Sequence, residues 1–89
     1  MNSNENWELK VDPAFHKALK KFPTRDASRI IAVFENHDFS PYSGDIEKIK
    51  GETDIWRRRI GAYRIFYEIN QVKRLVHLFH VERRKSKTY

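Results

Sequence analysis

Residues 56–69 constrain the fold more than any other segment, because they read as two short strands joined by a tight turn. Gly61 and Ala62 suit a two-residue type II′ turn, since glycine accepts the positive φ that the first central position requires. In that register Arg59 lies directly opposite Arg64, and two cations so placed repel each other unless an anion lies between them. The pattern therefore predicts an anion on this face, such as a nucleic-acid phosphate.

Side chains alternate between the two sides of a strand, so the hairpin has an apolar face and a cationic face. The apolar face is predicted to carry Arg58 together with Trp56, Ile60, Tyr63, Ile65, Tyr67 and Ile69. The cationic face carries Arg57, Arg59, Arg64, Phe66 and Glu68. Arg58 must reach out from the edge of the core or contact a partner. Glu68 is expected to orient Arg64.

The chain has 89 residues, enough for one domain with a small core, and residues 1–89 are taken as that domain. It has no cysteine, which excludes disulfides and thiolate metal sites. No stretch approaches the roughly 20 apolar residues of a membrane span, and residues 1–6 are expected to be a disordered tail. A cytoplasmic protein without a membrane partner is predicted. The formal charge of +6 favours polyanions or acidic proteins as partners.

Two amphipathic helices are predicted after a first strand at residues 7–11. Asp12 can cap the first helix, with Pro13 at the first helical position, where its missing N–H is not needed. Pro23 ends this helix and Thr24 can cap the second. In both helices the apolar residues recur at i, i+3, i+4 and i+7. They are Phe15, Ala18, Leu19 and Phe22, and then Ala27, Ile30, Ile31 and Phe34.

The remaining segments predict a loop at residues 36–45, a short strand at 46–50, a turn at 51–54 and a last strand at 75–81. The last strand has apolar residues at both parities, which predicts that it is central and covered on both faces. The order of elements predicts an α+β fold. It has an N-terminal strand, a two-helix hairpin and then three to four antiparallel strands, with the helices packed on one face of the sheet.

The chain resembles the RelE/ParE superfamily of bacterial and archaeal toxins. The resemblance is carried by Trp56-Arg57 through Tyr63-Arg64-Ile65-Phe66-Tyr67-Glu68-Ile69, by the preceding Lys48-Ile49-Lys50-Gly51, and by Arg83 with a tyrosine six positions later. The order of elements and the two-helix insertion also agree, so the resemblance covers nearly the whole chain.

This resemblance implies a toxin of a type II toxin-antitoxin system, neutralised by a cognate antitoxin whose segment wraps around it. In the RelE branch it implies an endoribonuclease, or mRNA interferase, that cleaves messenger RNA in the ribosomal A site without a metal or other cofactor. The cleavage proceeds by attack of a ribose 2′-hydroxyl on the adjacent phosphate. The ParE branch instead poisons DNA gyrase. A third alternative is an inert homologue that binds only its antitoxin, and operator DNA through the antitoxin complex.

The resemblance and the residue types together indicate candidate site residues. The positions that match catalytic or phosphate-binding residues of RelE-type toxins are Arg57, Arg59, Arg64, Arg83 and Tyr89. The candidate RNA-binding residues are Lys48, Lys50, Phe66 and Arg84. This basic set favours the RelE branch. Arg57 and Arg59 stand where the best-known RelE members have lysines, and arginine effectively cannot release its proton, so the general base stays unassigned.

His77 and His80 lie three residues apart in the last predicted strand, a spacing that predicts opposite faces. A zinc site built on this pair is therefore not expected. Either imidazole could serve as a general base near neutral pH, and the alternative is an ordinary core or edge histidine.

Overall fold

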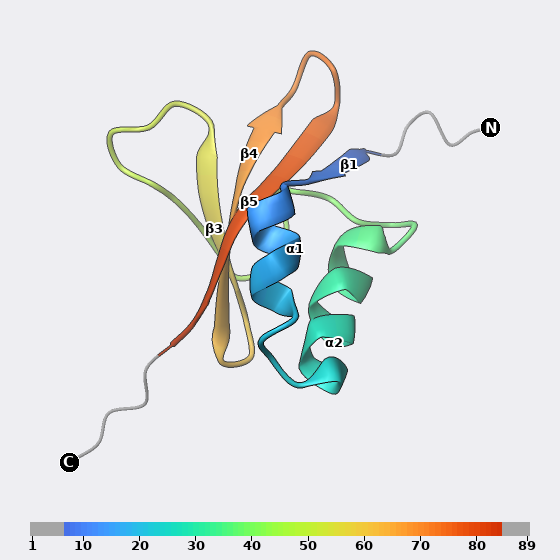
Figure 1. Cartoon of the computed structure of the whole chain (residues 1–89). Coiled ribbons are helices and arrows are strands. Elements are labelled where there is room, and N and C mark those ends of the chain that lie inside the picture. Colours follow the sequence, from blue (N-terminus) through green and yellow to red (C-terminus); the bar gives the residue numbers. More distant parts are fainter. Residues whose placement is uncertain (1–6, 85–89) are drawn as a thin grey trace.

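The computed structural model describes residues 7–84 of the chain. Figure 1 shows two helices on the same side of a five-stranded sheet. Along the chain the elements are β1 (Glu8–Val11), α1 (Pro13–Leu19), α2 (Thr24–Glu35), β2 (Ile46–Lys48), β3 (Ile55–Ile60), β4 (Tyr63–Asn70) and β5 (Leu75–Arg83). This arrangement confirms the predicted α+β fold class. The tail expected at residues 1–6 lies outside the described residues.

The strands follow the order β1-β5-β4-β3-β2 across the sheet. β2 to β5 pair antiparallel with their neighbours, while β1 pairs parallel with β5. The sheet is therefore mixed. The last strand has a neighbour on each side, as predicted. The prediction that both of its faces are covered is wrong, because the two helices lie on the same side of the sheet. The two short strands β1 and β2 form the edges.

The start of each helix is determined by a different residue. Asp12 caps α1, accepting a hydrogen bond from the Ala14 N–H at 2.9 Å, with Pro13 at the first helical position. At α2 the N-cap is Pro23, whose carbonyl accepts from the Asp26 N–H at 2.9 Å. The prediction that Thr24 caps this helix is wrong, because Thr24 is already its first helical residue. In residues 7–84, no helix has the length and apolar character needed to span a membrane.

The core lies between the helices and one face of the sheet. The helices contribute Phe15, Leu19, Ile30 and Phe34, and the sheet contributes Tyr63, Ile65, Tyr67, Ile69, Val76, Leu78 and Val81. Tyr63 also ties α2 to the sheet, because its hydroxyl donates a hydrogen bond to Asp26 Oδ2 at 2.6 Å. That hydrogen bond raises the pKa of Tyr63. No helix within residues 7–84 covers the opposite face of the sheet.

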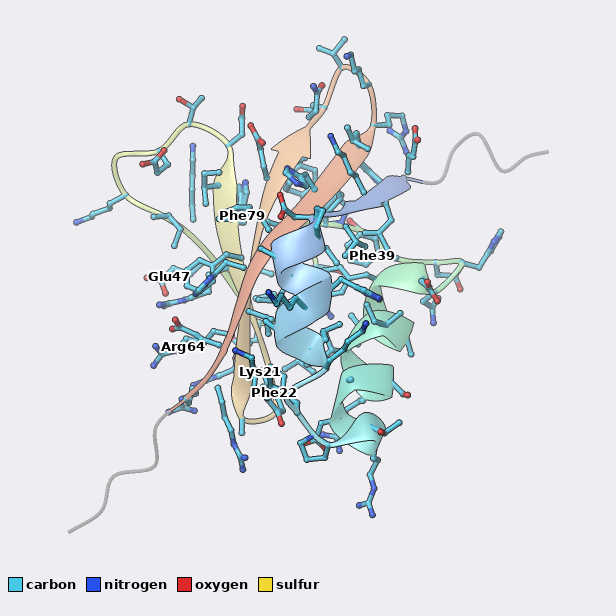
Figure 2. The ribbon with its side chains drawn as sticks, in the orientation of Figure 1. Lys21, Phe22, Phe39, Glu47, Arg64 and Phe79 are labelled. Carbon is cyan, nitrogen blue, oxygen red and sulfur yellow. The ribbon has the colours of Figure 1, made fainter. Side chains whose placement is uncertain are left out.

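The register of the β3–β4 hairpin is the one that its sequence predicts. Ile60 pairs with Tyr63 and Arg59 with Arg64. Gly61 has a φ of 60°, as the first central residue of the turn requires. The cationic side chains consequently project from the open face of the sheet. Figure 2 shows Arg64 and Glu47 on the side away from the two helices.

A β-bulge interrupts the pairing of β4 with β5. Phe66 pairs with His80, and the next residue, Tyr67, pairs with Leu78. Phe79 is therefore an extra residue on β5. An extra residue of this kind reverses the alternation of faces for every residue that follows it.

The bulge brings two histidines to the same face. His77 lies opposite Glu68 and His80 lies opposite Phe66, so both are on the open face. The prediction that they point to opposite faces is wrong, because it assumed unbroken alternation. The burial of Val76, Leu78 and Val81 follows the same shift.

The loop between α2 and β2 closes one end of the apolar face. The Tyr67 hydroxyl donates a hydrogen bond to the Pro41 carbonyl at 2.8 Å, and both residues are buried. Arg58 lies on this face, and a Cβ placed on Gly44 would be 2.5 Å from its Cζ. Its Nη1 is buried and has no hydrogen-bond partner among the described residues. The guanidinium of Arg58 is therefore held against the loop.

Gly44→Ala should destabilise the fold more than Gly51→Ala. Both glycines have positive φ, 89° and 84°, where an L-residue loses about 1 to 2 kcal/mol. The new methyl group at position 44 meets Arg58, whereas no described atom lies within 4 Å of the one at position 51. Because the contacted atoms are the end of the flexible Arg58 side chain, which can shift, urea unfolding should show a further loss of only about 0.5 to 1 kcal/mol for Gly44→Ala. A difference that persists in an Arg58→Ala background would contradict this explanation.

Tyr67 should make the protein sensitive to alkali. Burial raises its pKa to about 12 from the ordinary 10.0. Because the folded state holds this proton more tightly, the contribution is complete below about pH 10 and is lost as the pH rises towards 12. From about pH 8 to about pH 11 the free energy of unfolding should fall by roughly 1.4 kcal/mol. Tyr67→Phe should reduce this fall, measured by urea titration. Tyr42→Phe, at a side chain that is 43% exposed and that contributes only a minor part of the rise in the Tyr67 pKa, should retain most of it.

Candidate functional site

A small recess lies on the open face of the sheet. Its volume is about 180 Å³, and its lining residues are Asp45, Glu47, Arg57, Arg59, Arg64 and Arg84. The arginines come from three different strands or their ends, and the acids from β2 and the residue before it. The recess is therefore assembled by strand pairing from segments that lie far apart in the sequence.

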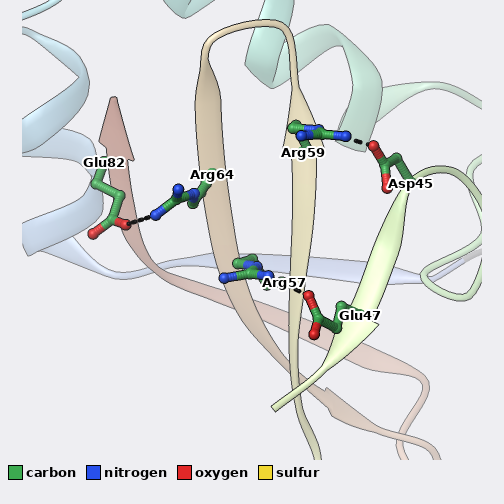
Figure 3. Close-up of polar contacts among 6 residues, drawn as sticks. All are labelled: Asp45, Glu47, Arg57, Arg59, Arg64 and Glu82. Atoms are coloured by element: carbon green, nitrogen blue, oxygen red, sulfur yellow. Dashed lines mark hydrogen bonds and ion pairs between the residues drawn. The ribbon is translucent and has the colours of Figure 1, made fainter. Parts of the chain in front are cut away.

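Each of three arginines is paired with a carboxylate (Figure 3). Arg57 contacts Glu47, Arg59 Nε contacts Asp45 Oδ2 at 2.9 Å, and Arg64 Nη1 contacts Glu82 Oε2 at 3.1 Å. The anions that the opposed arginines require are thus supplied within the protein itself. All six side chains are at least one-third exposed, so each pair contributes little to stability and can exchange its partner.

The pairing registers arrange these side chains in two rows across the sheet. The first row runs from β2 to β5 through Glu47, Arg57, Phe66 and His80. The second row consists of Asp45, Arg59, Arg64 and Glu82, and at its start the Arg59 N–H donates a hydrogen bond to the Asp45 carbonyl. The Phe66 and His80 rings are in contact, with centroids 5.2 Å apart. An aromatic surface therefore borders the arginines.

Glu82 bridges the two rows. Its Oε2 atom contacts Arg64, and its Oε1 atom lies 3.1 Å from His80 Nε2. The hydrogen bond with His80, followed by that with Arg64, lowers the pKa of Glu82 against the opposing effect of partial burial. Glu82 and not Glu68 orients Arg64, so the prediction for Glu68 is wrong. Glu68 lies nearer to His77, with Oε1 3.9 Å from its Nδ1.

The structure does not bring all the predicted site residues together. Arg83 follows the bulge onto the helix side of β5, where it pairs with Tyr63 and its Cζ lies 5.8 Å from that ring. Lys48 lies opposite Trp56 and thus on the other face from Arg57. Lys50 is exposed in the turn after β2. Tyr89 lies outside the described residues.

Three acids and one histidine at the site were not assigned to it from the sequence. Asp45 and Glu47 are two residues apart, a spacing that would indicate one face if β2 were known to pair with the arginine strand. Glu82 and His80 could not have been placed, because the bulge decides their face. The described residues contain no group of three histidine, aspartate or glutamate side chains suited to a metal ion.

A larger groove of about 800 Å³ lies on the helix side of the molecule. Its lining includes Leu19, Phe22, Ala27 and Ile31 and is mainly apolar. None of the predicted site residues that the structure describes lines it. The clustered charges of the open face make the smaller recess the candidate site.

Solved structures confirm the fold. One chain of the archaeal RelE–RelB complex from Pyrococcus horikoshii matches with 22% sequence identity and a TM-score of 0.77. The match covers 92% of this chain and 99% of that chain. A chain of the RelB–RelE complex from Methanococcus jannaschii has 28% identity and a TM-score of 0.69, with coverages of 83% and 88%. The isolated RelE toxin of E. coli has 20% identity and a TM-score of 0.68, with coverages of 91% and 87%.

Sequence comparison identifies the family. No curated protein matches this sequence. A family model described as the ParE toxin of type II toxin-antitoxin systems matches residues 9–87, which is most of the chain. The chain therefore belongs to the ParE toxin family, within the RelE/ParE superfamily of type II toxins.

Proposed function

We propose that this protein is a ribosome-dependent endoribonuclease that cleaves messenger RNA in the A site. The observation that supports this most strongly is the convergence of Arg57, Arg59, Arg64 and Arg84 on one recess. A guanidinium group is planar and can bind two phosphate oxygens at once. Four such groups around a small recess match the charge that develops on a phosphate during attack by a 2′-hydroxyl.

Within this proposal the predicted residues have distinct roles. Arg64 stabilises the phosphate, and Arg57 and Arg59 reinforce the positive field. Phe66 offers a ring on which a base can stack beside the cations. Arg84 contacts the RNA backbone from the same recess. Arg83, with Tyr89, Lys48 and Lys50, is assigned to RNA that extends beyond the recess.

The shallow site explains why the ribosome is needed. A recess of about 180 Å³ is too small to enclose a nucleotide and exclude water from it. The ribosome would hold the RNA so that the 2′-oxygen lies in line with the scissile bond. The phosphate must also displace the carboxylates of Asp45, Glu47 and Glu82 from the arginines. This displacement favours a substrate that is presented at high local concentration. The pure protein should therefore cleave free RNA weakly.

We also propose a cognate antitoxin as the regulatory partner in the cytoplasm. The matching structures from P. horikoshii and M. jannaschii are of RelE in complex with RelB. Operator DNA would be reached only through the toxin–antitoxin complex. The basic charge of the chain suits an acidic partner segment.

Inhibition of DNA gyrase is the second candidate, because the family model that matches is that of ParE toxins. A gyrase inhibitor acts by binding a protein and has no need of a phosphate site. Under that function, removal of a recess arginine would leave toxicity intact.

Arg64→Ala should strongly reduce messenger-RNA cleavage in cells. Loss of one charge-assisted phosphate contact raises the barrier by about 2 to 4 kcal/mol, or roughly 30- to 1,000-fold in rate. RNA 5′ ends should be mapped at codon resolution. Cuts should be as frequent for the control Arg25→Ala, at an exposed position of α2, as for the wild type, and far fewer for Arg64→Ala. DNA breaks without RNA cuts would support the gyrase function, and neither kind of damage would indicate an inert homologue.

Replacing the carboxylates of the recess should strengthen RNA binding. Asp45→Asn with Glu47→Gln frees Arg59 and Arg57 from their partners. Binding of a short single-stranded RNA at low salt should tighten by the order of tenfold, with a salt slope steeper by about 0.7 for each additional phosphate that the protein neutralises. The control, Glu35→Gln with Glu52→Gln, changes the net charge equally. Equal tightening in both double variants would contradict a specific role for the recess.

A further inference from the structure

The recess supplies positive charge but its lining residues supply no effective base. Its arginines stay protonated at any physiological pH. Its carboxylates, Asp45 and Glu47, are already occupied as the ion-pair partners of Arg59 and Arg57. A reaction that starts by removing a proton from a hydroxyl group needs another group within reach. Imidazole is the side chain whose basicity suits that step near neutral pH.

His80 is joined to the recess through one carboxylate. Glu82 Oε1 lies 3.1 Å from His80 Nε2, and Glu82 Oε2 lies 3.1 Å from Arg64 Nη1. With Nε2–H donated to Glu82, the neutral ring presents its Nδ1 lone pair as an acceptor. A carboxylate that fixes the tautomer of a histidine in this way is the device by which hydrolases prepare a base.

The position of the ring is also defined by packing. Phe66 contacts the imidazole from β4, with a centroid distance of 5.2 Å and an interplanar angle of 59°. The charged groups that face His80 are Glu82 on its own strand and, on β4, Arg64 and Glu68, which flank Phe66. α1 packs on the other face of β5. His80 and Arg64 are diagonal neighbours, about 7 to 8 Å apart along the sheet, a span that a ribose and its phosphate can bridge.

We propose that His80 is the general base of the RNA cleavage, and that Glu82 positions it while also holding Arg64. This inference rests on the proposed endoribonuclease function. His80 Nδ1 takes the proton of the 2′-hydroxyl as the 2′-oxygen forms a bond to phosphorus. The bond from phosphorus to the 5′-oxygen breaks, and the leaving oxygen takes a proton from water. The products are a 2′,3′-cyclic phosphate and a 5′-hydroxyl end.

His77 does not fit this role, although it lies on the same face. It pairs with Glu68, four residues along β4 from Arg64, and its Nε2 is 3.4 Å from Asp12 Oδ2. It is therefore farther from the recess and has no carboxylate in common with a recess arginine among the described residues. The bulge at Phe79 thus selects His80.

The test is single-turnover cleavage of messenger RNA on programmed ribosomes by the full chain. His80→Ala should slow cleavage by about 10²- to 10⁴-fold, which is the usual contribution of a general base. Added imidazole should restore part of the cleavage rate of His80→Ala. The wild-type rate should fall as the solution is acidified, and the rate of His80→Ala should not show this fall. His16→Ala, on α1 at the opposite side of the molecule, should cleave as the wild type does.

Glu82→Gln separates positioning from chemistry. It should cleave more slowly than the wild type and should not respond to imidazole, because its own ring is still present. Cleavage by His80→Ala at the wild-type rate, or a slow rate that imidazole leaves unchanged, would overturn the role of His80 while leaving the endoribonuclease function in place. Wild-type protein that cuts no ribosome-bound RNA would overturn both.

Discussion

Burial of only one face of the sheet is the constraint on which the rest of the structure depends. Two helices cover that face, so the strands direct most of their apolar residues towards them, and most of their charged residues lie on the other side. In the β3–β4 hairpin this requirement concentrates Arg57, Arg59 and Arg64 within two adjacent rows. Arg58 is the exception, and the loop around Gly44 covers its guanidinium. The cationic site is thus a consequence of how the core is built.

Concentrated arginines need counterions, and the fold provides them from the strands on either side. Glu47 approaches from β2, Asp45 from the residue before it, and Glu82 from β5. Because these pairs are exposed, they neutralise charge without holding the arginines firmly. A phosphate can replace a carboxylate at modest free-energy cost. The resting protein therefore carries a site that is ready to bind an anion while its own acids balance the charge.

A single extra residue in β5 decides which side chains join that site. If the strand alternated without interruption, Arg83 would share a face with Arg64, while His80 and Glu82 would point towards the helices. The bulge at Phe79 reverses this, so Arg84 lines the recess and Glu82 pairs with Arg64. Arg83 instead lies beside the ring of Tyr63. Irregularities of this kind leave no signal in hydrophobic periodicity, because apolar residues occur at both parities in this strand.

The sequence by itself determined the elements, the turn at Gly61 and the register of the arginine hairpin, because these depend on neighbours a few residues apart. It also indicated which helix residues are buried, through their spacing. The tertiary structure alone decided the partners of the arginines, the face of His80 and the separation of Arg83 from Arg64. Those features depend on pairing between strands that are distant in the chain and on one bulge. No local pattern of residues encodes them, because their energy comes from contacts that exist only once the sheet has formed.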